Sequence, residues 1–352
     1  MTGFWKGRKV FLTGHTGFKG AWLSLWLEKL GAEVAAVSLD PPAGESLYKR
    51  LSPWREQAHY AADIRDTRSF EDVVYDFCPE IVIHLAAQTL VRHSYQYPSE
   101  TFSTNVMGTT NVLDVVRNTP SVKTVIIVTS DKVYANDGSG HPFIETDPLG
   151  GKDPYSNSKA CTELVVQSYR DSFFRQRPVR VATVRAGNVI GGGDWAKDRI
   201  VPDFIRALDS DQPILLRNPQ AVRPWQHVLE PLSGYLAFAE ALTLECEKEL
   251  PDALNFGPDA SNFATVAELV DALASAHGSK RGWQRDPGEH PPEASALTLN
   301  SARAFAALGW RPRLNMDETI KWTSAWYEAC RNGADMRQFT LRQIAAYEEA
   351  IQ

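Results

Sequence analysis

The first half of the chain alternates short apolar runs with longer stretches in which apolar residues return every three or four positions. The short runs predict β-strands, and the three-to-four spacing predicts amphipathic helices. The predicted strands are Lys9–Thr13, Glu33–Leu39, Gln57–Ala61, Ile81–Leu85, Thr124–Thr129 and Arg180–Val184, and the predicted helices are Phe18–Leu30, Thr67–Phe77, Ser99–Arg117 and Tyr155–Phe174. Strands that alternate with helices of this length predict an α/β fold built on a doubly wound parallel sheet.

The pattern changes after Val184. Residues 185–224 contain three consecutive glycines and several prolines, which predicts loops, and residues 278–300 are again rich in proline. Elsewhere in this half the spacing predicts a strand at Ala253–Phe256 and helices at Pro231–Leu244, Thr265–His277, Met316–Cys330 and Leu341–Ile351. A chain of 352 residues exceeds the size at which single cores usually stop growing. We expect two lobes and a C-terminal helix. The first lobe comprises residues 1–185 and about 225–255. The second lobe is smaller and discontinuous, with residues of about 186–224 and 256–335, and the C-terminal helix spans 336–352.

Residues 13–20 read Thr-Gly-His-Thr-Gly-Phe-Lys-Gly, between the first predicted strand and the first predicted helix. Gly14 permits a tight turn, Gly17 lets the backbone approach a pyrophosphate, and Gly20 lets the helix pack close to the strand. Free N–H groups at the helix N-terminus attract phosphate. Because two strands and a helix surround the motif, a dinucleotide site in a Rossmann-type domain is favoured over a turn without a ligand.

The end of the second predicted strand indicates which dinucleotide binds. Asp40 follows the apolar run Glu33–Leu39. A carboxylate at this place accepts hydrogen bonds from the ribose hydroxyls of NAD and repels a 2′-phosphate. The sequence therefore predicts NAD, and not NADP, as the cofactor. We expect Lys19, inside the glycine turn, to point to solvent rather than to a phosphate.

Composition excludes several classes of function. The net charge of −6 provides no basic face for nucleic acid, and there is no polybasic segment or long apolar run for a membrane. The N-terminus carries no secretory signal pattern, so we expect a cytoplasmic protein. The cysteines lie far apart and are expected to be reduced thiols, and the eight histidines form no ligand cluster, so no structural metal is predicted. The cysteines are Cys78, Cys161, Cys246 and Cys330.

Two short segments carry groups suited to proton transfer. Tyr155 and Lys159 lie four residues apart on a predicted helix, which places them on one face, one turn apart. A nearby ammonium stabilises a phenolate, so we expect a lowered pKa for Tyr155. Ser130, Asp131 and Lys132 follow the fifth predicted strand, and ligands of open parallel sheets bind at the carboxyl ends of the strands. We therefore expect these three residues to face a cleft beside Tyr155.

The order of these motifs resembles the extended short-chain dehydrogenase/reductase superfamily over nearly the whole chain. The matching segments are the glycine turn, Leu85-Ala86-Ala87-Gln88, Ser130, Tyr155-x-x-x-Lys159, Arg185-x-x-Asn188-x-x-Gly191 and the segment Arg223–Val228. The resemblance implies that NAD is held by Gly14, Thr16, Gly17, Phe18, Gly20, Asp40, Asp63, Ile64, Leu85, Ala86, Ala87, Thr104, Tyr155 and Lys159. It implies that a nucleotide sugar is held by Gln88, Ser94, Asn188, Trp195, Arg217 and Arg223.

Two of these residues have a second interpretation. Trp195 either contacts the pyrimidine or ribose of the nucleotide or fills the core of the small lobe. Arg217 either pairs with the diphosphate or is a solvated loop arginine. Arg223 is the better candidate for the diphosphate, since a guanidinium can pair with it bidentately.

Within the superfamily, Ser130-Asp131-Lys132 resembles two groups of sugar-nucleotide dehydratases, because most relatives carry Thr-Asp-Glu there. These are the CDP-glucose 4,6-dehydratases and the inverting UDP-N-acetylglucosamine dehydratases. Three longer segments, at residues 15–23, 90–95 and 191–195, resemble the CDP-D-glucose 4,6-dehydratases. The resemblance implies a lyase that converts CDP-D-glucose to CDP-4-dehydro-6-deoxy-D-glucose and water in deoxysugar or lipopolysaccharide biosynthesis. It also implies a homodimer or a dimer of dimers.

The resemblance further implies a role for each catalytic residue. Tyr155 takes the proton of the sugar 4-hydroxyl while C4 gives hydride to NAD, and Ser130 and Lys159 assist. Asp131 is expected to protonate the departing 6-hydroxyl, and Lys132 to remove the C5 proton. A free lysine titrates near ~10.4, so Lys132 must be desolvated or held near other cations to act as a base. The alternatives are another nucleotide-sugar dehydratase, a 4-epimerase and a non-catalytic NAD-binding protein. The Asp131-Lys132 pair argues against the epimerase, because an epimerase needs no acid at O6.

Overall fold

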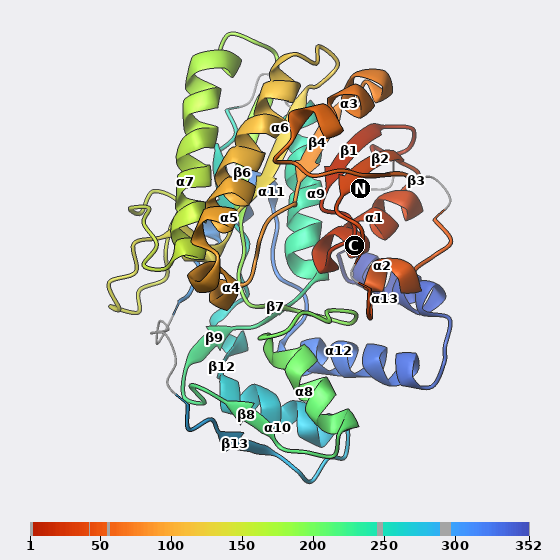
Figure 1. Ribbon diagram of the computed structural model, residues 1–352, viewed down its shortest axis with the longest axis vertical. Coiled ribbons are helices and arrows are strands. Elements are labelled where there is room, and N and C mark those ends of the chain that lie inside the picture. The colour runs from red at the N-terminus through yellow and green to blue at the C-terminus, as the bar shows by residue number, and fades with distance from the viewer. Residues whose placement is uncertain (1–2, 42, 55–56, 245–248, 289–296, 352) are drawn as a thin grey trace.

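Seven parallel strands form the central sheet, in the order β11-β6-β5-β4-β1-β2-β3 (Figure 1). The structure is a computed structural model that describes residues 3–41, 43–54, 57–244, 249–288 and 297–351. The strand order reverses between β1 and β4, which creates a topological switch point where ligands of such sheets bind. This arrangement confirms the predicted doubly wound parallel sheet. The strands are β1 (Lys9–Thr13), β2 (Glu33–Ser38), β3 (Gln57–Ala61), β4 (Ile81–His84), β5 (Thr124–Val128), β6 (Arg180–Arg185) and β11 (Ala253–Asn255).

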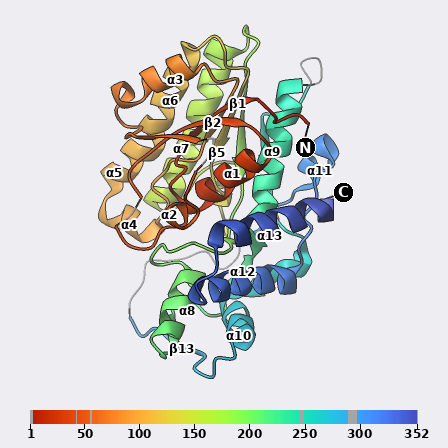
Figure 2. The ribbon, with the colours of Figure 1, turned by 90° about the vertical axis from the view of Figure 1, so that its right-hand side faces the viewer.

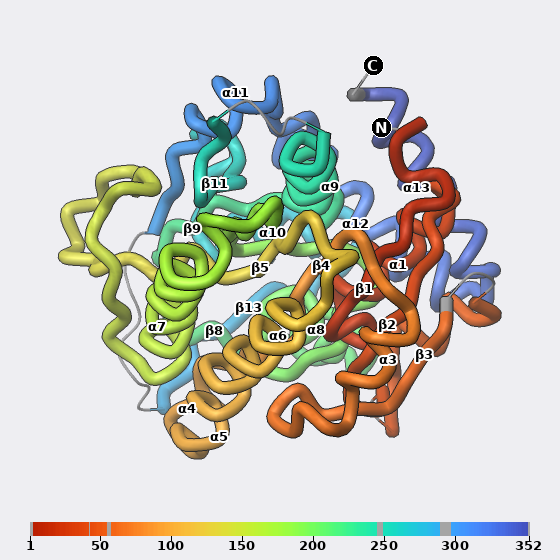
Figure 3. Tube along the Cα trace, turned by 90° about the horizontal axis from the view of Figure 1, so that it is seen from above, coloured from red at the N-terminus to blue at the C-terminus, as the bar shows by residue number. Residues whose placement is uncertain are grey.

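Helices cover both faces of the sheet (Figure 3). In β1, the side chain of Leu12 packs into the core on one face of the sheet, which also contains residues of two helices. The side chain of Phe11 packs into the core on the opposite face. Successive side chains of a strand point to opposite faces, and here both faces are buried, which explains why the strands are continuous apolar runs. The helices are α1 (Phe18–Lys29) and α9 (Leu229–Leu244) on the first face, and α3 (Glu71–Phe77), α6 (Gly108–Arg117) and α7 (Pro154–Tyr169) on the second.

A smaller lobe lies below the sheet in Figures 1 and 2. It contains the helices α8 (Ile200–Asp209), α10 (Val266–Ala276) and α12 (Met316–Arg331), and the strand pairs β8 (Ile214–Leu216) with β13 (Trp283–Arg285) and β9 (Val222–Pro224) with β12 (Phe263–Thr265). The C-terminal helix α13 (Met336–Ile351) leaves this lobe and packs against α1 (Figure 2).

Short elements complete the chain. The helices are α2 (Leu47–Arg50), α4 (Val91–Gln96), α5 (Pro98–Phe102) and α11 (Ala302–Leu308), and the strands are β7 (Val189–Ile190) and β10 (Gln226–His227). The 3₁₀ turns are η1 (Thr67–Ser69), η3 (Asp131–Val133) and η5 (Ala260–Asn262), and the π turns are η2 (Ser103–Met107) and η4 (Arg170–Phe174).

Among the described residues, the sequence pattern missed four helices, α2, α4, α8 and α11. The most instructive is α8, which lies in the segment predicted to be loop. Val201, Phe204 and Ile205 are buried at helical spacing. The helix was not predicted because Pro202 lies within this pattern, and proline usually indicates a break in a helix. A proline is tolerated here because it lies in the first helical turn, where its missing N–H has no helical partner.

The predicted domain boundaries remain a prediction. The helix α11 falls in the range assigned to the smaller lobe, but it packs against α9 and β11 of the sheet half. The predicted C-terminal helix starts earlier than its apolar spacing indicated, at Met336 rather than Leu341. Cys246 lies outside the described residues; Cys78, Cys161 and Cys330 are free thiols.

A buried ion pair ties the second layer of helices to the sheet. The carboxylate of Glu163 on α7 accepts hydrogen bonds from Arg185 at the end of β6, with N–O distances of 2.9 and 2.8 Å. The same carboxylate accepts hydrogen bonds from Thr129 at 2.5 Å and Thr183 at 2.7 Å. Both charged side chains are about 4% exposed. The pair therefore fixes α7 relative to the carboxyl ends of β5 and β6.

We predict that Arg185→Met destabilises the protein strongly. Removal of one partner leaves Glu163 as an uncompensated buried charge, which typically costs about 3–5 kcal/mol of unfolding free energy. The control is Arg175→Met, which breaks an ion pair with Asp171 whose side chains are 73% and 44% exposed and should cost about 0–1 kcal/mol. Urea denaturation of both variants measures the difference. Equal effects would show that the buried pair does not hold the fold.

Candidate active site

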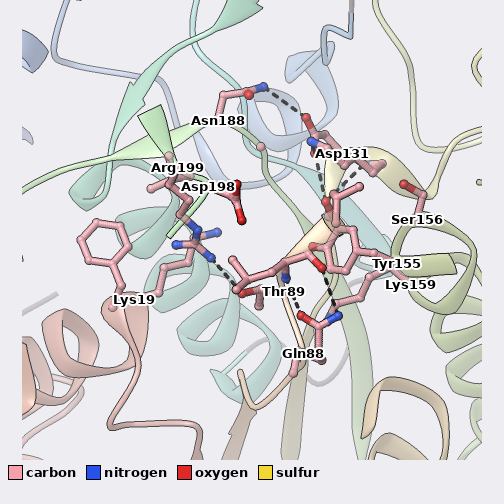
Figure 4. A pocket seen from close by; sticks show the side chains of 18 of the residues that line it. Lys19, Gln88, Thr89, Asp131, Tyr155, Ser156, Lys159, Asn188, Asp198 and Arg199 are labelled. Carbon is pink, nitrogen blue, oxygen red and sulfur yellow. Dashed lines mark hydrogen bonds and ion pairs between the residues drawn. The ribbon is translucent and has the colours of Figure 1, made fainter. Parts of the chain in front are cut away.

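A cavity of about 1120 Å³ opens at the carboxyl ends of the parallel strands. Its wall combines the glycine turn after β1, the loops after β4 and β5, the start of α7 and several segments of the smaller lobe. In Figure 4, Asp131, Tyr155 and Lys159 lie on one side of this pocket, and Lys19 and Arg199 lie on the opposite side. The fold therefore gathers the predicted chemical groups at the switch point of the sheet.

The glycine turn has the geometry that a dinucleotide needs. Gly14 adopts a φ of +78°, and a Cβ there would lie 2.6 Å from the backbone nitrogen of Ala86. A Cβ on Gly20 would lie 2.1 Å from the carbonyl oxygen of Gly14. Gly17 is the N-cap of α1, and the first helical turn, whose N–H groups lack helical partners, lies in the cavity wall. The residues present fit the diphosphate of a dinucleotide.

Most of the residues predicted to hold the cofactor line the cavity. The exception is Asp40, which is exposed and absent from the wall, where Ser38 and Leu39 lie instead. The hydroxyl of Thr16 pairs with that of Ser38 at 2.7 Å. The structure thus does not support direct contact between Asp40 and the cofactor. The predicted residues in the wall are Gly14, Thr16, Gly17, Phe18, Gly20, Asp63, Ile64, Leu85, Ala86, Ala87, Thr104, Tyr155 and Lys159.

The five predicted catalytic residues, Ser130, Asp131, Lys132, Tyr155 and Lys159, all line the cavity. Asp131 is 1% exposed, and Ser130 donates to its Oδ1 at 3.0 Å. The ammonium of Lys132 lies 3.4 Å from the same oxygen. The Lys132 side chain keeps 32% of its surface exposed, so its burial is incomplete. The Lys159 ammonium donates to the carbonyl of Val128 at 3.0 Å.

The pKa of Tyr155 differs from the sequence prediction. Burial raises it above the ordinary value, because a phenolate loses its hydration in the cavity. A hydrogen bond from Ser130 and the charge of Lys132 act in the opposite direction, but burial outweighs them. Burial also lowers the pKa of the Lys159 ammonium, to about 8. The expectation of a lowered pKa for Tyr155 was wrong.

Four of the six residues predicted to hold the nucleotide sugar line the cavity, namely Gln88, Asn188, Arg217 and Arg223. Ser94 is fully buried outside the wall, where it donates to the carbonyl of Val91 and accepts the N–H of Tyr155 at 3.1 Å. Trp195 is also absent from the wall, and its ring packs edge-on against Tyr327 at 5.3 Å. Its structural interpretation, as a filler of the small-lobe core, agrees with this position.

Sequence reasoning misplaced one positively charged residue of the cavity, Lys19, and missed another, Arg199. Lys19 faces the cavity and not the solvent, and burial lowers its pKa to about 8. Its ammonium lies 6.0 Å from the ring centroid of Tyr235. Arg199, at the start of α8, pairs with Asp194 at 2.8 Å and donates to Thr89 at 2.8 Å. No sequence pattern singled out Arg199, because α8 itself was not predicted.

Among the described residues, no group of three or more His, Cys, Asp or Glu side chains is arranged to hold a metal ion. In the same part of the chain, no helix combines the length and apolar character needed to cross a bilayer.

Comparisons with known proteins agree with this geometry. The sequence profile described as "NAD dependent epimerase/dehydratase family" matches residues 10–249. The chain is 46% identical to a CDP-glucose 4,6-dehydratase of Salmonella typhimurium, over 99% of this chain and 98% of that one. A dTDP-glucose 4,6-dehydratase from Streptomyces venezuelae, solved with NAD, superposes with a TM-score of 0.80 at 20% identity, over 94% of this chain and 99% of that one.

A UDP-glucose 4-epimerase of Thermus thermophilus, solved as a complex with NAD, has a TM-score of 0.77 at 26% identity, over 90% of this chain and 98% of that one. The chain belongs to the NAD dependent epimerase/dehydratase family, and NAD is its cofactor.

We predict that Gly187→Ala disables the site by moving Asp131. A Cβ at residue 187 would lie 1.8 Å from Oδ2 of Asp131, and a displacement of about 1 Å in a catalytic group can cost about 10²-fold in rate. Turnover of a nucleotide-sugar substrate measures the loss. Gly44→Ala is the control, because a Cβ there meets nothing within 4 Å and should leave turnover unchanged. Full activity of Gly187→Ala would show that the position of Asp131 is not limiting.

Proposed function

We propose that this chain is a CDP-D-glucose 4,6-dehydratase, which converts CDP-D-glucose to CDP-4-dehydro-6-deoxy-D-glucose and water. The observation that carries the proposal is the buried Asp131, with Lys132 beside it, in the same cavity as Ser130, Tyr155 and Lys159. A 4-epimerase moves a hydride at C4 only and needs no second acid–base pair. The relative of 46% identity that carries the name of this enzyme supports the cytidine nucleotide.

The first half-reaction oxidises C4 of the sugar. NAD, when bound, accepts the hydride from C4 and returns it to C6 later in the cycle. Tyr155 takes the proton of the 4-hydroxyl, and Ser130 hydrogen-bonds the same oxygen. Lys159 orients the cofactor side of the site from one helical turn beyond Tyr155. The product of this half-reaction is a 4-ketone, which makes the C5 proton acidic.

The second half-reaction removes water across C5 and C6. Lys132 takes the C5 proton, the C6–O bond breaks, and Asp131 gives a proton to the departing 6-hydroxyl. Hydride then arrives at C6, and a proton returns to C5. Asp131 is well placed for this role because Ser130 and Asn188 both donate to its carboxylate, at 3.0 and 3.4 Å, and so orient it.

Several charged groups are available for the nucleotide diphosphate. Arg217 and Arg223 come from the smaller lobe and line the cavity. Lys19 and Arg199 add positive charge on the side opposite Asp131 (Figure 4). Incubation with CDP-, dTDP-, UDP- and GDP-glucose tests the nucleotide preference directly. We expect a 4-keto-6-deoxy product from CDP-glucose; conversion of another nucleotide sugar in its place would reassign the substrate.

Three further expectations accompany this function. A homodimer is supported by exposed apolar side chains on the outer helical layer, where Met107 is 52%, Leu164 54% and Phe173 40% exposed. Such a face is suited to a second copy of the chain. A cytoplasmic location and a place in deoxysugar or lipopolysaccharide biosynthesis remain predictions.

We predict that the hydride returns within the same molecule of sugar. With CDP-glucose deuterated at C4, deuterium should appear at C6 of the product, and C5 should gain hydrogen from solvent. Mass spectrometry and NMR of the product locate both atoms. A product that lacks deuterium at C6, together with net accumulation of NADH, would contradict a dehydratase and indicate a simple dehydrogenase.

A second prediction concerns Lys132. If it takes the C5 proton, Lys132→Met should still oxidise C4 and then stop, and exchange of the C5 hydrogen with deuterated solvent should fall together with water loss. A positioned base typically contributes about 10²–10⁴-fold. If Lys132 only orients Asp131, C5 exchange should continue while water loss slows. The two rates, measured in one sample by NMR, separate these roles.

A further inference from the structure

Gln226 is a fully buried polar residue for which the proposed mechanism has no role. It belongs to β10, which pairs with β7. Its side-chain Nε2 donates to the carbonyl oxygens of Gly187 at 3.1 Å and of Phe256 at 2.9 Å. Its backbone N–H donates to the carbonyl of Asn188 at 3.3 Å. One residue therefore holds both carbonyls of the Gly187–Asn188 turn, which lies against Asp131.

We propose that Gln226 is a positioning residue for the loss of water, because it holds the Gly187–Asn188 turn in place against the Asp131 carboxylate. The inference rests on the proposed dehydratase function, in which Asp131 protonates the departing 6-hydroxyl. It adds that the oxidation of C4, in which Tyr155 takes the proton, does not depend on Gln226. Loss of the Gln226 amide should therefore separate the two half-reactions.

The Gly187–Asn188 turn determines the place of one oxygen of Asp131. A Cβ on Gly187 would lie 1.8 Å from Oδ2, so the carboxylate packs directly on the backbone of the turn. The side-chain amide of Asn188 donates to the same Oδ2 at 3.4 Å (Figure 4). Ser130 and Lys132, from the loop of Asp131 itself, contact Oδ1 instead, at 3.0 and 3.4 Å. A shift of the turn therefore changes the position of Oδ2, which the contacts on Oδ1 do not fix.

The turn needs support from outside its own segment. It lies between β6 and β7, and residues 186–188 belong to neither a helix nor a strand. Asn188 adopts a φ of +52°, a left-handed conformation that is uncommon for a residue with a side chain. Both carbonyl oxygens of the turn accept hydrogen bonds from Gln226. The bonds from Gln226 thus hold a short irregular segment that has no regular ladder of its own.

The second partner of the amide is a well-packed part of the core. Phe256 follows β11 and is fully buried, and its ring packs edge-on against Trp310 with centroids 4.9 Å apart. The N–H of Phe256 donates to the carbonyl of Arg185, at the end of β6, at 2.8 Å. The Gln226 amide cannot flip without cost, because its oxygen would then face two carbonyl acceptors. It therefore ties the turn to the edge of the sheet in one orientation.

The group that takes the proton of the 4-hydroxyl has a separate support. In the part of the chain that the structure describes, the side-chain hydrogen bonds of Gln226 go to Gly187 and Phe256 and not to Tyr155. Tyr155 lies at the start of α7, and its backbone N–H donates to the hydroxyl of Ser94 at 3.1 Å. A change at Gln226 should therefore disturb the acid and leave the tyrosine in place.

The test is Gln226→Met, which removes the amide and keeps a side chain of similar size. In a single turnover with CDP-glucose, near-ultraviolet absorbance follows NADH, and rapid quenching with mass spectrometry follows water loss. We expect NADH to form within a few-fold of the wild-type rate and water loss to be about 10- to 10²-fold slower, because a displacement of about 1 Å can cost about 10²-fold. NADH should then accumulate and decay slowly. Equal slowing of both steps, or unchanged water loss, would overturn the proposal.

Gln343→Met is the matched control. Gln343 on α13 is 9% exposed, and its Nε2 donates to the carbonyl of Trp322 at 2.9 Å. Its Oε1, like that of Gln226, is buried without a hydrogen-bond partner among the described residues. Gln343 does not line the cavity. Its replacement should lower stability towards urea but leave the ratio of the two rates unchanged. A change in that ratio as large as in Gln226→Met would reduce the effect to weakened packing and overturn the proposal.

Two further variants give independent tests. Gln226→Asn keeps the amide on a side chain one methylene shorter, and it should show the same selective loss even if the methionine variant does not fold. In the Asp131→Asn enzyme, which has lost the acid, Gln226→Met should slow water loss no further. Additive slowing in the double variant would show that Gln226 does not act through Asp131, and it would overturn the proposal. Conversion of CDP-glucose by wild-type enzyme, measured in parallel, reports separately whether the proposed function itself holds.

Discussion

The buried ion pair between Glu163 and Arg185 is the constraint on which the catalytic arrangement depends. Glu163 lies on the helix α7 that carries Tyr155, and Arg185 ends β6, the neighbour of the strand that leads into Ser130. Through Thr129 and Thr183 the same carboxylate also holds the ends of β5 and β6. A buried ion pair costs desolvation energy and contributes little net stability compared with apolar residues. Its main effect here is to fix the position of α7 relative to the ends of β5 and β6. Here that geometry brings a helix and a strand end within hydrogen-bonding reach of each other.

Burial changes the pKa values of several ionisable groups in the cavity. Removal of water raises the pKa of Tyr155 and lowers the pKa values of Lys19 and Lys159 to about 8, because each charged form loses hydration. Burial therefore favours the uncharged form of the phenol and of both lysines more than water would.

The sequence predicted the layout of the sheet, and it predicted that Ser130, Asp131 and Tyr155 face one cleft, because both depend on local patterns. Apolar runs mark the strands, three glycines mark a turn that tolerates no Cβ, and Ser130 and Tyr155 follow directly from the elements that carry them. Asp40 was predicted from its distance after the glycine turn, but it is exposed and does not line the cavity. Lys19 was misjudged, and the two interpretations of Trp195 stayed open, for a related reason. Their surroundings come from α12 and from the opposite wall of the cavity, which are remote in sequence and leave no local signal.

The position of Asp131 shows how far such remote contributions reach. Asp131 belongs to the loop after β5, but the space for its carboxylate is provided by Gly187 in the loop after β6. The next residue, Asn188, adopts a φ of +52° and donates to Asp131 at 3.4 Å; asparagine tolerates this left-handed conformation better than most residues. The Asp131 side chain is therefore positioned in part by a glycine and an asparagine that follow the adjacent strand. Two neighbouring loops thus set the position of this carboxylate, and a search by the Asp-Lys pair alone would overlook the second loop.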